Sequence, residues 1–270
     1  MANGLTVLVA DADEETRLAL VEAIEISDPG ARIIEVCNGR ELAAMLAERH
    51  VDVVFVDVIL PAMDVEALRC WRAAYGPGAM TVLVSDMLAP RWPSIAKLVG
   101  AYDVLLKPLN EQHVARVLAA GRVIRQSLRL LVVEPRAATR ALIRRLLRES
   151  HFSFDLAEAE RGAVAMRTAR IKTFDVVMIE AELPDVPALE IACQVSDRHP
   201  DAKILLMGFS MAAVPARQLE LFGACGYLRK PFSFADVDRA IHEAFGLWHP
   251  YLVKALQNGD DLLPMQALGA

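Results

Sequence analysis

The sequence contains an internal repeat with a constant interval. Three charged residues, each at the end of a short apolar run, recur 123 residues later in the chain. The pairs are Asp11 and Glu134, Asp57 and Glu180, and Lys107 and Lys230. One interval shared by three separated positions indicates the duplication of a single domain of about 123 residues. The chain is therefore restricted to folds that can be built from two copies of one unit.

Within each copy, short runs of Val, Ile and Leu alternate with segments of helical period. In the first copy we predict strands near 5–10, 31–36, 52–57, 80–85 and 102–106, and helices near 14–26, 39–49, 63–75, 91–99 and 110–126. In the second copy we predict strands near 129–133, 153–158, 174–179, 202–207 and 225–229, with helices between them. This alternation predicts an α/β fold, a five-stranded parallel sheet with helices on both faces. We expect domains at 1–126 and 127–246 and a C-terminal tail at 247–270.

Composition and charge exclude several classes of protein. Hydrophobic residues make up 54% of the chain and its mean hydropathy is +0.31, yet no apolar run approaches the roughly 18 residues that span a membrane. Parallel strands, which are buried on both faces, account for this hydropathy. The net charge of −6 argues against a nucleic-acid partner, and the N-terminus lacks the features of a signal peptide. We expect a cytoplasmic protein that binds neither nucleic acid nor membrane.

Candidate functional residues follow the strands of the first copy. A parallel α/β sheet gathers such residues at the carboxyl ends of its strands, so we expect Asp11, Asp57, Ser85 and Lys107 to lie at one edge. A carboxylate can accept a phosphoryl group to form an aspartyl phosphate. A divalent cation and a lysine can neutralise the charge in that reaction, and a hydroxyl can donate a hydrogen bond to the phosphoryl oxygens. These residue types predict phosphoryl transfer to Asp57.

This pattern resembles the receiver domains of two-component response regulators, duplicated in tandem, with a flavodoxin-like (βα)5 fold. Its most specific parts are VDVVFVDVILPAMD around Asp57 and GAYDVLLKP around Lys107, and the resemblance covers both copies. It implies that a histidine kinase or phosphotransfer protein phosphorylates Asp57, and that Ser85 and Lys107 complete the site. It also implies that Asp11, Asp57 and the backbone carbonyl of Ile59 bind Mg²⁺. The chain would act on a downstream regulator by protein–protein contact and would not be an enzyme.

The first copy departs from the family pattern at two positions. Family members have a pair of acidic residues after the first strand that binds Mg²⁺. Ala12 stands where the second member of this acidic pair is expected, and it removes one charged ligand for a hard cation. Asp13 follows one residue later and is an alternative ligand for Mg²⁺. Val104 stands where family members often have an aromatic switch residue. Two interpretations of Asp57 follow: a working phosphoacceptor, or a relic carboxylate paired with Lys107.

The second copy resembles a pseudo-receiver, a receiver that has lost its chemistry. Glu180 replaces the phosphoacceptor, only Glu134 remains of the acidic pair, and Gly208 replaces the hydroxyl residue. Lys230 is retained, and Tyr227 stands at the aromatic switch position. We predict no phosphorylation here. Glu180 is long enough to form a permanent ion pair with the lysine, and that pair either imitates the phosphorylated state or is purely structural.

The first helix of the second copy is strongly basic. Spacing by four places four arginines on one face, namely Arg136, Arg140, Arg144 and Arg148. The opposite face is expected to be buried through its apolar residues, namely Leu142, Ile143, Leu146 and Leu147. The corresponding helix of the first copy is acidic instead, with Glu14, Glu15, Glu22 and Glu25. The arginine face is either a solvated surface or a docking surface for an acidic partner.

Two functions of different classes fit these residues. In the first, the chain is an atypical stand-alone response regulator of a phosphorelay, phosphorylated at Asp57 and acting by protein–protein contact. In the alternative, it is a phosphorylation-independent adaptor or scaffold built from two degenerate receivers. Asp57 and Lys107 favour the first function, whereas Ala12 and Glu180 favour the second. We prefer a combination in which one half is switchable and the other is fixed.

Overall fold

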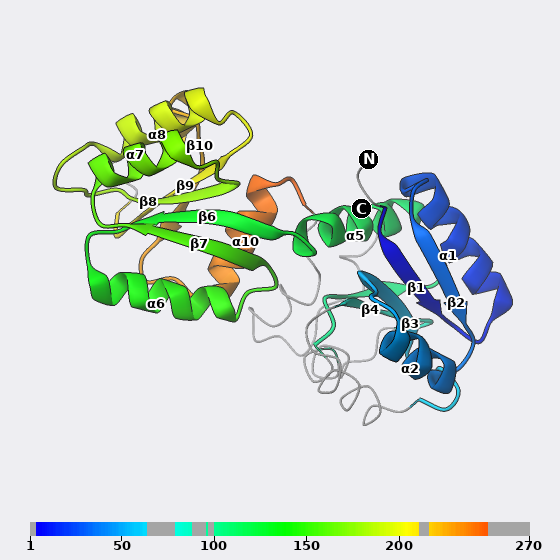
Figure 1. Cartoon of the computed structure of the whole chain (residues 1–270). Helices are drawn as coiled ribbons and strands as arrows, with labels where there is room; N and C mark the ends of the chain where they lie inside the picture. Colours follow the sequence, from blue (N-terminus) through cyan, green and yellow to red (C-terminus); the bar gives the residue numbers. More distant parts are fainter. Residues whose placement is uncertain (1–3, 64–78, 88–95, 97–99, 211–215, 248–270) are drawn as a thin grey trace. The chain divides into compact units, whose positions relative to one another are not determined.

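The computed structural model describes residues 4–63, 79–87, 96, 100–210 and 216–247 (Figure 1). The chain divides into two compact units, with the boundary between Arg125 and Gln126. Unit 1 is the part before this boundary, and unit 2 extends from Gln126 to Leu247. Each contains one five-stranded sheet whose strands are all parallel. The predicted α/β fold of two tandem flavodoxin-like domains is therefore confirmed.

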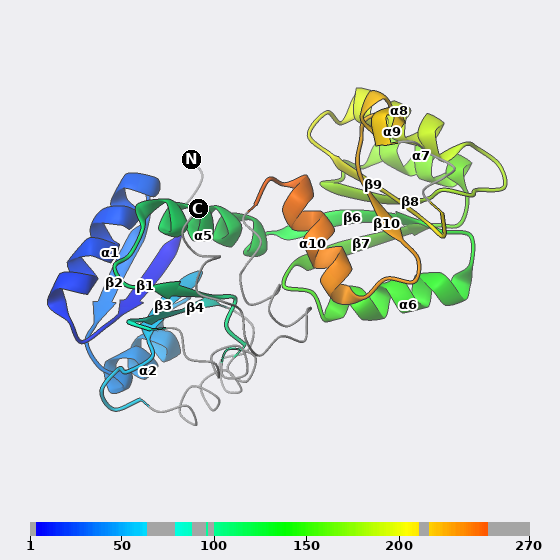
Figure 2. The same cartoon turned by 180° about the vertical axis from the view of Figure 1, so that it is seen from behind.

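Unit 1 alternates strands and helices in chain order. The described elements are β1 (Thr6–Ala10), α1 (Glu14–Ser27), β2 (Arg32–Val36), α2 (Gly39–Glu48), β3 (Val53–Asp57), β4 (Met80–Ser85), β5 (Asp103–Leu106) and α5 (Glu111–Ile124). The sheet order is β2-β1-β3-β4-β5. Helices α1 and α5 cover one face of this sheet and α2 lies on the other (Figures 1 and 2). The helices predicted near 63–75 and 91–99 fall, apart from Met63 and Ala96, outside the described residues.

Unit 2 repeats this arrangement with the same connections. Its elements are β6 (Ser127–Val133), α6 (Ala137–Arg148), β7 (Ser153–Ala159), α7 (Gly162–Ile171), β8 (Val176–Glu180), α8 (Ala188–Arg198), β9 (Lys203–Gly208), α9 (Ala216–Leu221), β10 (Ala224–Arg229) and α10 (Phe234–Ala244). The sheet order is β10-β9-β8-β6-β7. Helices α6 and α10 cover one face, and α7 and α8 cover the other (Figure 2).

The hydrophobic pattern explains which strands are central. Every residue of β3, β4 and β8 is buried, because helices cover both faces of these strands. The edge strands β2 and β7 are instead partly exposed and carry charged residues. In unit 1, β1 and β3 are neighbours with Ala10 opposite Val56. Asp11 and Asp57, the residues that follow this pair, are thereby placed at the same edge of the sheet.

Candidate functional site

Three of the predicted residues meet at the carboxyl edge of the sheet in unit 1. The Nζ atom of Lys107 lies 2.5 Å from Oδ2 of Asp57 and 2.8 Å from Oδ2 of Asp11. Asp57 ends β3, Asp11 follows β1, and Lys107 follows β5 and precedes a cis peptide bond to Pro108. Both carboxylates are buried. We call Asp11, Asp57 and Lys107 the first acidic site.

Burial and pairing oppose each other in this site. Burial raises the pKa of Asp11, with a further contribution from the charge of Asp57, and the pairing with Lys107 only partly offsets it. Burial lowers the pKa of Lys107, but hydrogen bonds and charge attraction from the two carboxylates outweigh this, so the net shift is upward. Oδ2 of Asp11 is buried, and among the described residues its polar contact is the ammonium of Lys107 at 2.8 Å. This oxygen therefore keeps a lone pair available for a cation.

The loops around the first acidic site hold the other predicted residues. The backbone N–H of Ile59 donates a hydrogen bond of 2.5 Å to Oδ1 of Asp57, which fixes the carboxylate from the side opposite Lys107. Ser85 is buried at the end of β4, and its hydroxyl donates to the carbonyl of Met87 at 2.8 Å. Ser85 thus closes the turn after its strand, and its expected contact with a phosphoryl group stays a prediction.

Asp13 is engaged by helix α1. Its Oδ2 accepts hydrogen bonds from the backbone N–H of Thr16 at 2.8 Å and from the Thr16 hydroxyl at 2.6 Å. These bonds lower the pKa of Asp13 and make it the N-cap of α1. The buried carboxylates of the site are therefore Asp11 and Asp57. Within the described part of the chain, no group of three or more His, Cys, Asp or Glu residues is arranged to hold a metal ion.

The equivalent edge of unit 2 is a closed ion-pair cluster. Lys230 Nζ lies 2.5 Å from Oε2 of Glu134 and also contacts Oε2 of Glu180. All three side chains are buried. The remaining oxygens accept hydrogen bonds from the backbone N–H groups of Arg136 and Glu182, at 2.9 and 3.3 Å. We call Glu134, Glu180 and Lys230 the second acidic site.

The two glutamates of the second acidic site differ in their proton affinity. Burial raises the pKa of Glu134, but the hydrogen bonds from Lys230 and the Arg136 N–H, together with the charge of Lys230, outweigh burial and leave the net pKa below its usual value. For Glu180, burial dominates over the attraction of Lys230, and the net pKa is raised. A lysine shared by two buried carboxylates is a stable arrangement only while all three groups are paired, because an unpaired buried charge is costly.

Tyr227 occupies the space where a receiver would have its hydroxyl residue. The Tyr227 hydroxyl donates to the carbonyl of Ser210 at 2.9 Å. A Cβ atom added to Gly208 would lie 2.4 Å from the Tyr227 hydroxyl oxygen, far inside van der Waals contact. Burial, followed by the negative charges of Glu180 and Glu182, raises the pKa of Tyr227. Gly208 is therefore needed for Tyr227 to point inward over β9.

The structure also identifies a functional residue that sequence reasoning missed. In unit 1, a guanidinium nitrogen of Arg17 donates to the carbonyl oxygens of Asp11 and Ala12, at 2.9 and 3.1 Å. The same side chain lies 3.6 Å from Glu35 on β2. Arg17 thus holds the loop that carries Asp11. Its equivalent one repeat later is Arg140, so comparing the two copies at the shared interval of 123 residues is the signal that would have found both.

Arg140 holds the corresponding loop of unit 2. It donates to the carbonyls of Glu134 and Pro135, at 2.7 and 3.1 Å, and pairs with Glu158 of β7 at 3.2 Å. Arg144 pairs with the other oxygen of Glu158 at 3.3 Å. Two of the four arginines predicted to form a partner surface are therefore engaged within unit 2.

Other arginines at helix α6 are exposed. Arg136 and Arg148 lie on the surface, together with Arg145. Leu142, which we expected on the buried face, is 54% exposed, whereas Ile143 is fully enclosed. The buried face of α6 is centred on Ile143 and Leu147. It is narrower than the four apolar residues of the sequence indicate, so Leu142 faces solvent. Contact of an acidic partner with this surface stays a prediction.

Two (βα)5 units, each with carboxylates and a lysine at the carboxyl edge of a parallel sheet, define the class of tandem receiver proteins. The sequence matches the response regulator receiver domain family twice, over residues 7–119 and 130–242. The chain therefore belongs to the response regulator receiver family, and the resemblance stated from the sequence is confirmed.

Individual relatives agree with this assignment. The chain is 29% identical to the chemotaxis protein CheY of Listeria monocytogenes over 120 residues, which cover 43% of this chain and 98% of CheY. It is 28% identical to the transcriptional regulatory protein PdtaR of Mycobacterium tuberculosis over 116 residues, or 43% of this chain and 56% of PdtaR. A solved two-component response regulator/GGDEF domain protein matches the fold with a TM-score of 0.63 and 16% identity, over 90% of this chain and 98% of that one.

Family membership carries several general properties. Receiver domains are signalling modules of two-component phosphorelays, generally without enzymatic activity, and they interact with histidine kinases and phosphotransfer proteins. They typically bind Mg²⁺ at their acidic site. Among the helices that the structure describes, none is long and apolar enough to cross a membrane.

Proposed function

We propose that this chain is an atypical response regulator in which unit 1 is switched by phosphorylation of Asp57 and unit 2 is a fixed pseudo-receiver. The observation that carries the proposal is the contrast between the two acidic sites. In unit 1, Lys107 holds the carboxylates of Asp11 and Asp57 at an edge whose phosphoacceptor position is an aspartate. In unit 2, both carboxylates belong to glutamates and are already satisfied by Lys230 and backbone N–H groups.

The chemistry expected of the first acidic site is transfer of a phosphoryl group to Asp57. The phosphorus–nitrogen bond of a phosphohistidine on a histidine kinase or phosphotransfer protein breaks as a carboxylate oxygen of Asp57 bonds to phosphorus. The released imidazole takes up a proton. Such transfer depends mainly on position and charge neutralisation. Lys107 contacts both carboxylates and is placed to pair with the added phosphoryl oxygens, and the N–H of Ile59 keeps the nucleophilic carboxylate oriented.

The first acidic site also fits a divalent cation. Mg²⁺ is usually bound through one or two carboxylates and keeps several water ligands. Asp11 and Asp57 would supply the two carboxylates, and Oδ2 of Asp11, which contacts Lys107, would also face the cation. The carbonyl of Ile59 is the further ligand that the family resemblance implies. When bound, the cation would neutralise charge on the phosphoryl group. Because Ala12 offers no ligand and Asp13 caps α1, we expect the affinity to be lower than with a third carboxylate.

The second acidic site is expected to stay in one state. Glutamate at position 180 places its charge one methylene further from the strand than aspartate would, and Lys230 meets it directly. Tyr227 is held inward by Ser210 above a glycine that leaves it room. We propose that unit 2 presents one constant surface to a downstream regulator while unit 1 changes state.

Intact-mass spectrometry tests this proposal. The full chain is incubated with Mg²⁺ and acetyl phosphate, alongside the variants Asp57→Asn and Glu180→Gln. We expect one added phosphoryl group on the wild type and on Glu180→Gln, and none on Asp57→Asn. Loss of the added group in hydroxylamine would identify it as an acyl phosphate.

Failure of the wild type to gain mass, under conditions that label an ordinary receiver, would refute the phosphoacceptor role of Asp57. The phosphorylation-independent adaptor would then be the better description, since the ion pairs of both units would be purely structural. A second added group, lost in Glu180→Gln, would refute the fixed state of unit 2.

A further inference from the structure

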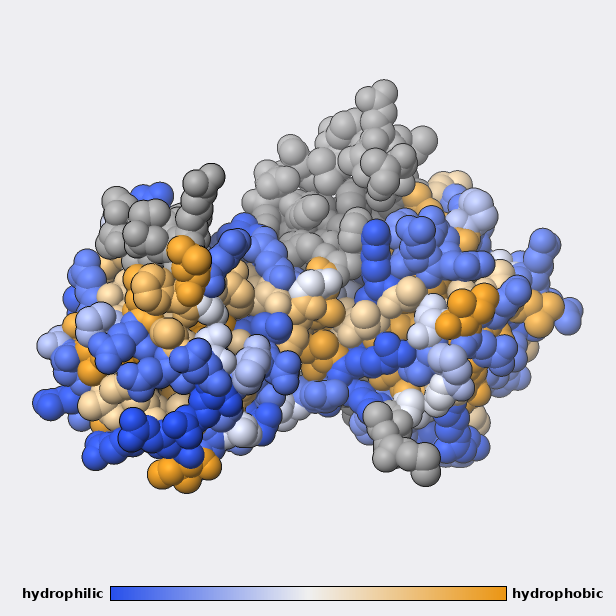
Figure 3. Space-filling view, turned by 90° about the horizontal axis from the view of Figure 1, so that it is seen from above, coloured by the Kyte–Doolittle hydropathy of each residue, from blue (hydrophilic) through white to orange (hydrophobic). Residues whose placement is uncertain are grey.

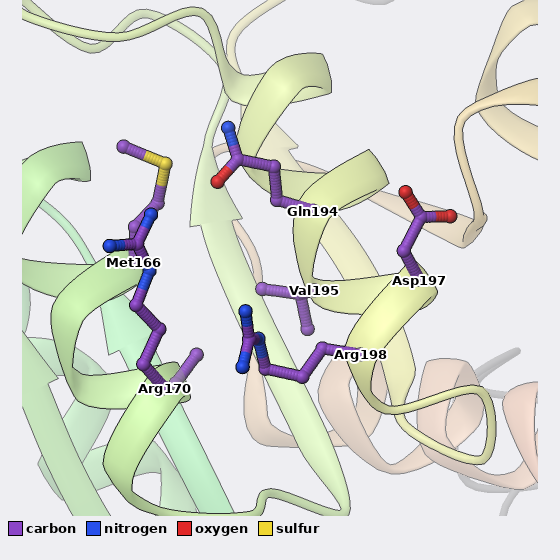
Figure 4. Close-up of a pocket in the computed structure, with 7 residues that line it drawn as sticks. Met166, Arg170, Gln194, Val195, Asp197 and Arg198 are labelled. Carbon is purple, nitrogen blue, oxygen red and sulfur yellow. The ribbon is translucent and has the colours of Figure 1, made fainter.

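A hollow of about 340 Å³ lies between helices α7 and α8 of unit 2, away from both acidic sites. Its floor is apolar and includes Met166 and Val195, and its rim carries Arg170 from α7 and Arg198 from α8. Arg198 extends from α8 toward α7, Arg170 lies alongside α7 on the opposite side of the hollow, and Asp197 points away from the hollow (Figure 4). The view onto this side of unit 2 shows hydrophobic residues between hydrophilic ones (Figure 3).

The two arginines of this hollow lack partners within the described part of the chain. Neither guanidinium has a hydrogen bond or ion pair with any residue that the structure describes, and both residues are exposed. They differ in this respect from Arg140 and Arg144, which pair with Glu158. A guanidinium binds a carboxylate through two parallel hydrogen bonds and is a frequent anchor of interfaces. The hollow therefore fits an apolar side chain flanked by carboxylates.

Helix α1 of this chain presents such a pattern. Leu18 and Ile26 are 58% and 61% exposed, which is unusual for large apolar side chains, and exposed Glu22 and Glu25 lie beside them. Positions 18, 22, 25 and 26 follow helical spacing, so all four lie on one face. We call Leu18, Glu22, Glu25 and Ile26 the α1 stripe. At about 100° per residue, Leu18 lies between Glu25 and Glu22 on this face, and Ile26 lies beyond Glu22. Leu18 with its flanking glutamates is complementary to the apolar floor and basic rim of the hollow.

We infer that the α1 stripe of a second copy of this chain docks into the α7–α8 hollow. An amphipathic helix lying in a groove between two helices is a common mode of recognition. The 14 residues of α1 span about 21 Å, long enough to lie along α7 and α8. The two surfaces are unlike, so the contact is heterologous. A closed dimer forms only if each copy docks its α1 into the hollow of the other copy.

The contact is expected to be weak and sensitive to salt. A surface of this extent is smaller than a standard interface, and such small interfaces are typical of transient association. Charge pairs at the rim of an interface are screened by added salt. Sedimentation velocity of the full chain, from about 1 to 200 µM at low salt, should therefore show a weight-average sedimentation coefficient that rises with concentration. Raising the salt to about 0.5 M should weaken the association roughly tenfold.

Charge-reversal variants identify the surfaces. Arg170→Glu with Arg198→Glu should weaken self-association at least about tenfold, and Glu22→Arg with Glu25→Arg should do the same. An equimolar mixture of the two double variants should associate again, because each reversed hollow meets a reversed helix. Leu18→Ser tests the apolar side chain between the two glutamates without a change of charge. The matched control, Arg136→Glu with Arg148→Glu, reverses two exposed arginines of α6 outside the hollow and should leave association within about twofold of wild type.

Several outcomes would overturn the inference. A wild-type chain that stays monomeric over the whole concentration range would do so at once. Association that survives reversal of Arg170 and Arg198 would place the contact elsewhere. Loss in the hollow variant without loss in the α1 variant would show that a different acidic segment fills the hollow. An equal loss in the α6 control would show that general charge, and not this hollow, drives association.

Discussion

Replacement of Gly208 by alanine tests whether Tyr227 is locked in place. The added Cβ would lie 2.4 Å from the Tyr227 hydroxyl oxygen, whereas ordinary van der Waals contact begins at 3.4 Å, so the ring must move by about 1 Å. Gly208 has no positive φ, so the backbone itself accepts alanine. The clash with Tyr227 is therefore the main effect of the substitution.

The size of the effect follows from three contributions. Displacement of the ring breaks the 2.9 Å hydrogen bond to Ser210, a net loss of about 0.5–1.5 kcal/mol. Overpacking costs about 1–3 kcal/mol. Replacing glycine within a strand returns about 0.5–1 kcal/mol, because the unfolded chain loses freedom. We expect Gly208→Ala to lower the free energy of unfolding of unit 2 by about 1–3 kcal/mol.

Tyr227→Phe supplies the matched background. Without the hydroxyl, the nearest atoms to the new Cβ are the Ala181 Cβ at 3.2 Å and the ring carbon Cζ at 3.4 Å, so alanine needs a shift of only a few tenths of an ångström. In this background Gly208→Ala should change stability by less than about 0.5 kcal/mol. Native-state hydrogen exchange, read by mass spectrometry on peptides from β8 and β9, measures the stability of unit 2 separately from unit 1. An equal cost of Gly208→Ala in both backgrounds would refute the steric role of Tyr227.

Three further predictions follow from the caps and ion pairs. Asp13→Ala should lower the unfolding free energy of unit 1 by about 1 kcal/mol through loss of the N-cap, and an accompanying large fall in Mg²⁺ affinity by calorimetry would contradict a capping role. Arg140→Met should destabilise unit 2 by about 1–3 kcal/mol, because the loop carbonyls lose their hydrogen-bond donor. The control Arg145→Met, at an exposed position, should cost less than about 0.5 kcal/mol. Hydrogen exchange measures both, and equal effects would count against the loop contact. Lys230→Met should destabilise unit 2 by about 3–5 kcal/mol near pH 7. The lowered pKa of Glu134 contributes stability that is present above pH 4.5 and is lost as the pH falls through the folded-state pKa. The cost of Lys230→Met should therefore shrink in acid. A cost that does not depend on pH would contradict the pairing of Lys230 with Glu134.

Much of the architecture follows from local sequence pattern. The interval of 123 residues and the apolar runs predict two parallel sheets, because a strand covered on both faces must be apolar throughout. The same pattern places Asp11, Asp57 and Lys107 at the carboxyl ends of three strands, and a parallel sheet brings these ends to one edge. The sequence alone therefore predicts that these three side chains, and their equivalents in unit 2, lie close together.

Other features depend on where side chains point in the folded chain. Asp13 is one residue from the expected ligand position, and only the start of α1 turns its carboxylate to Thr16 and away from Lys107. Arg140 and Arg148 have the same spacing pattern, yet only Arg140 reaches the loop carbonyls. Residue type and spacing do not determine such orientations, because they depend on rotamers selected by distant neighbours.

The state of the second unit likewise appears only in three dimensions. From the sequence, Gly208 reads as the loss of a hydroxyl and Tyr227 as a retained aromatic, with no relation between them. Neighbouring strands β9 and β10 bring the two together, and the phenol fills the space that the missing side chain leaves. Sequence pattern therefore specified the fold and the residues at each edge, while tertiary packing decided which of them are free to react and which are already bound, since those contacts join residues far apart in the chain.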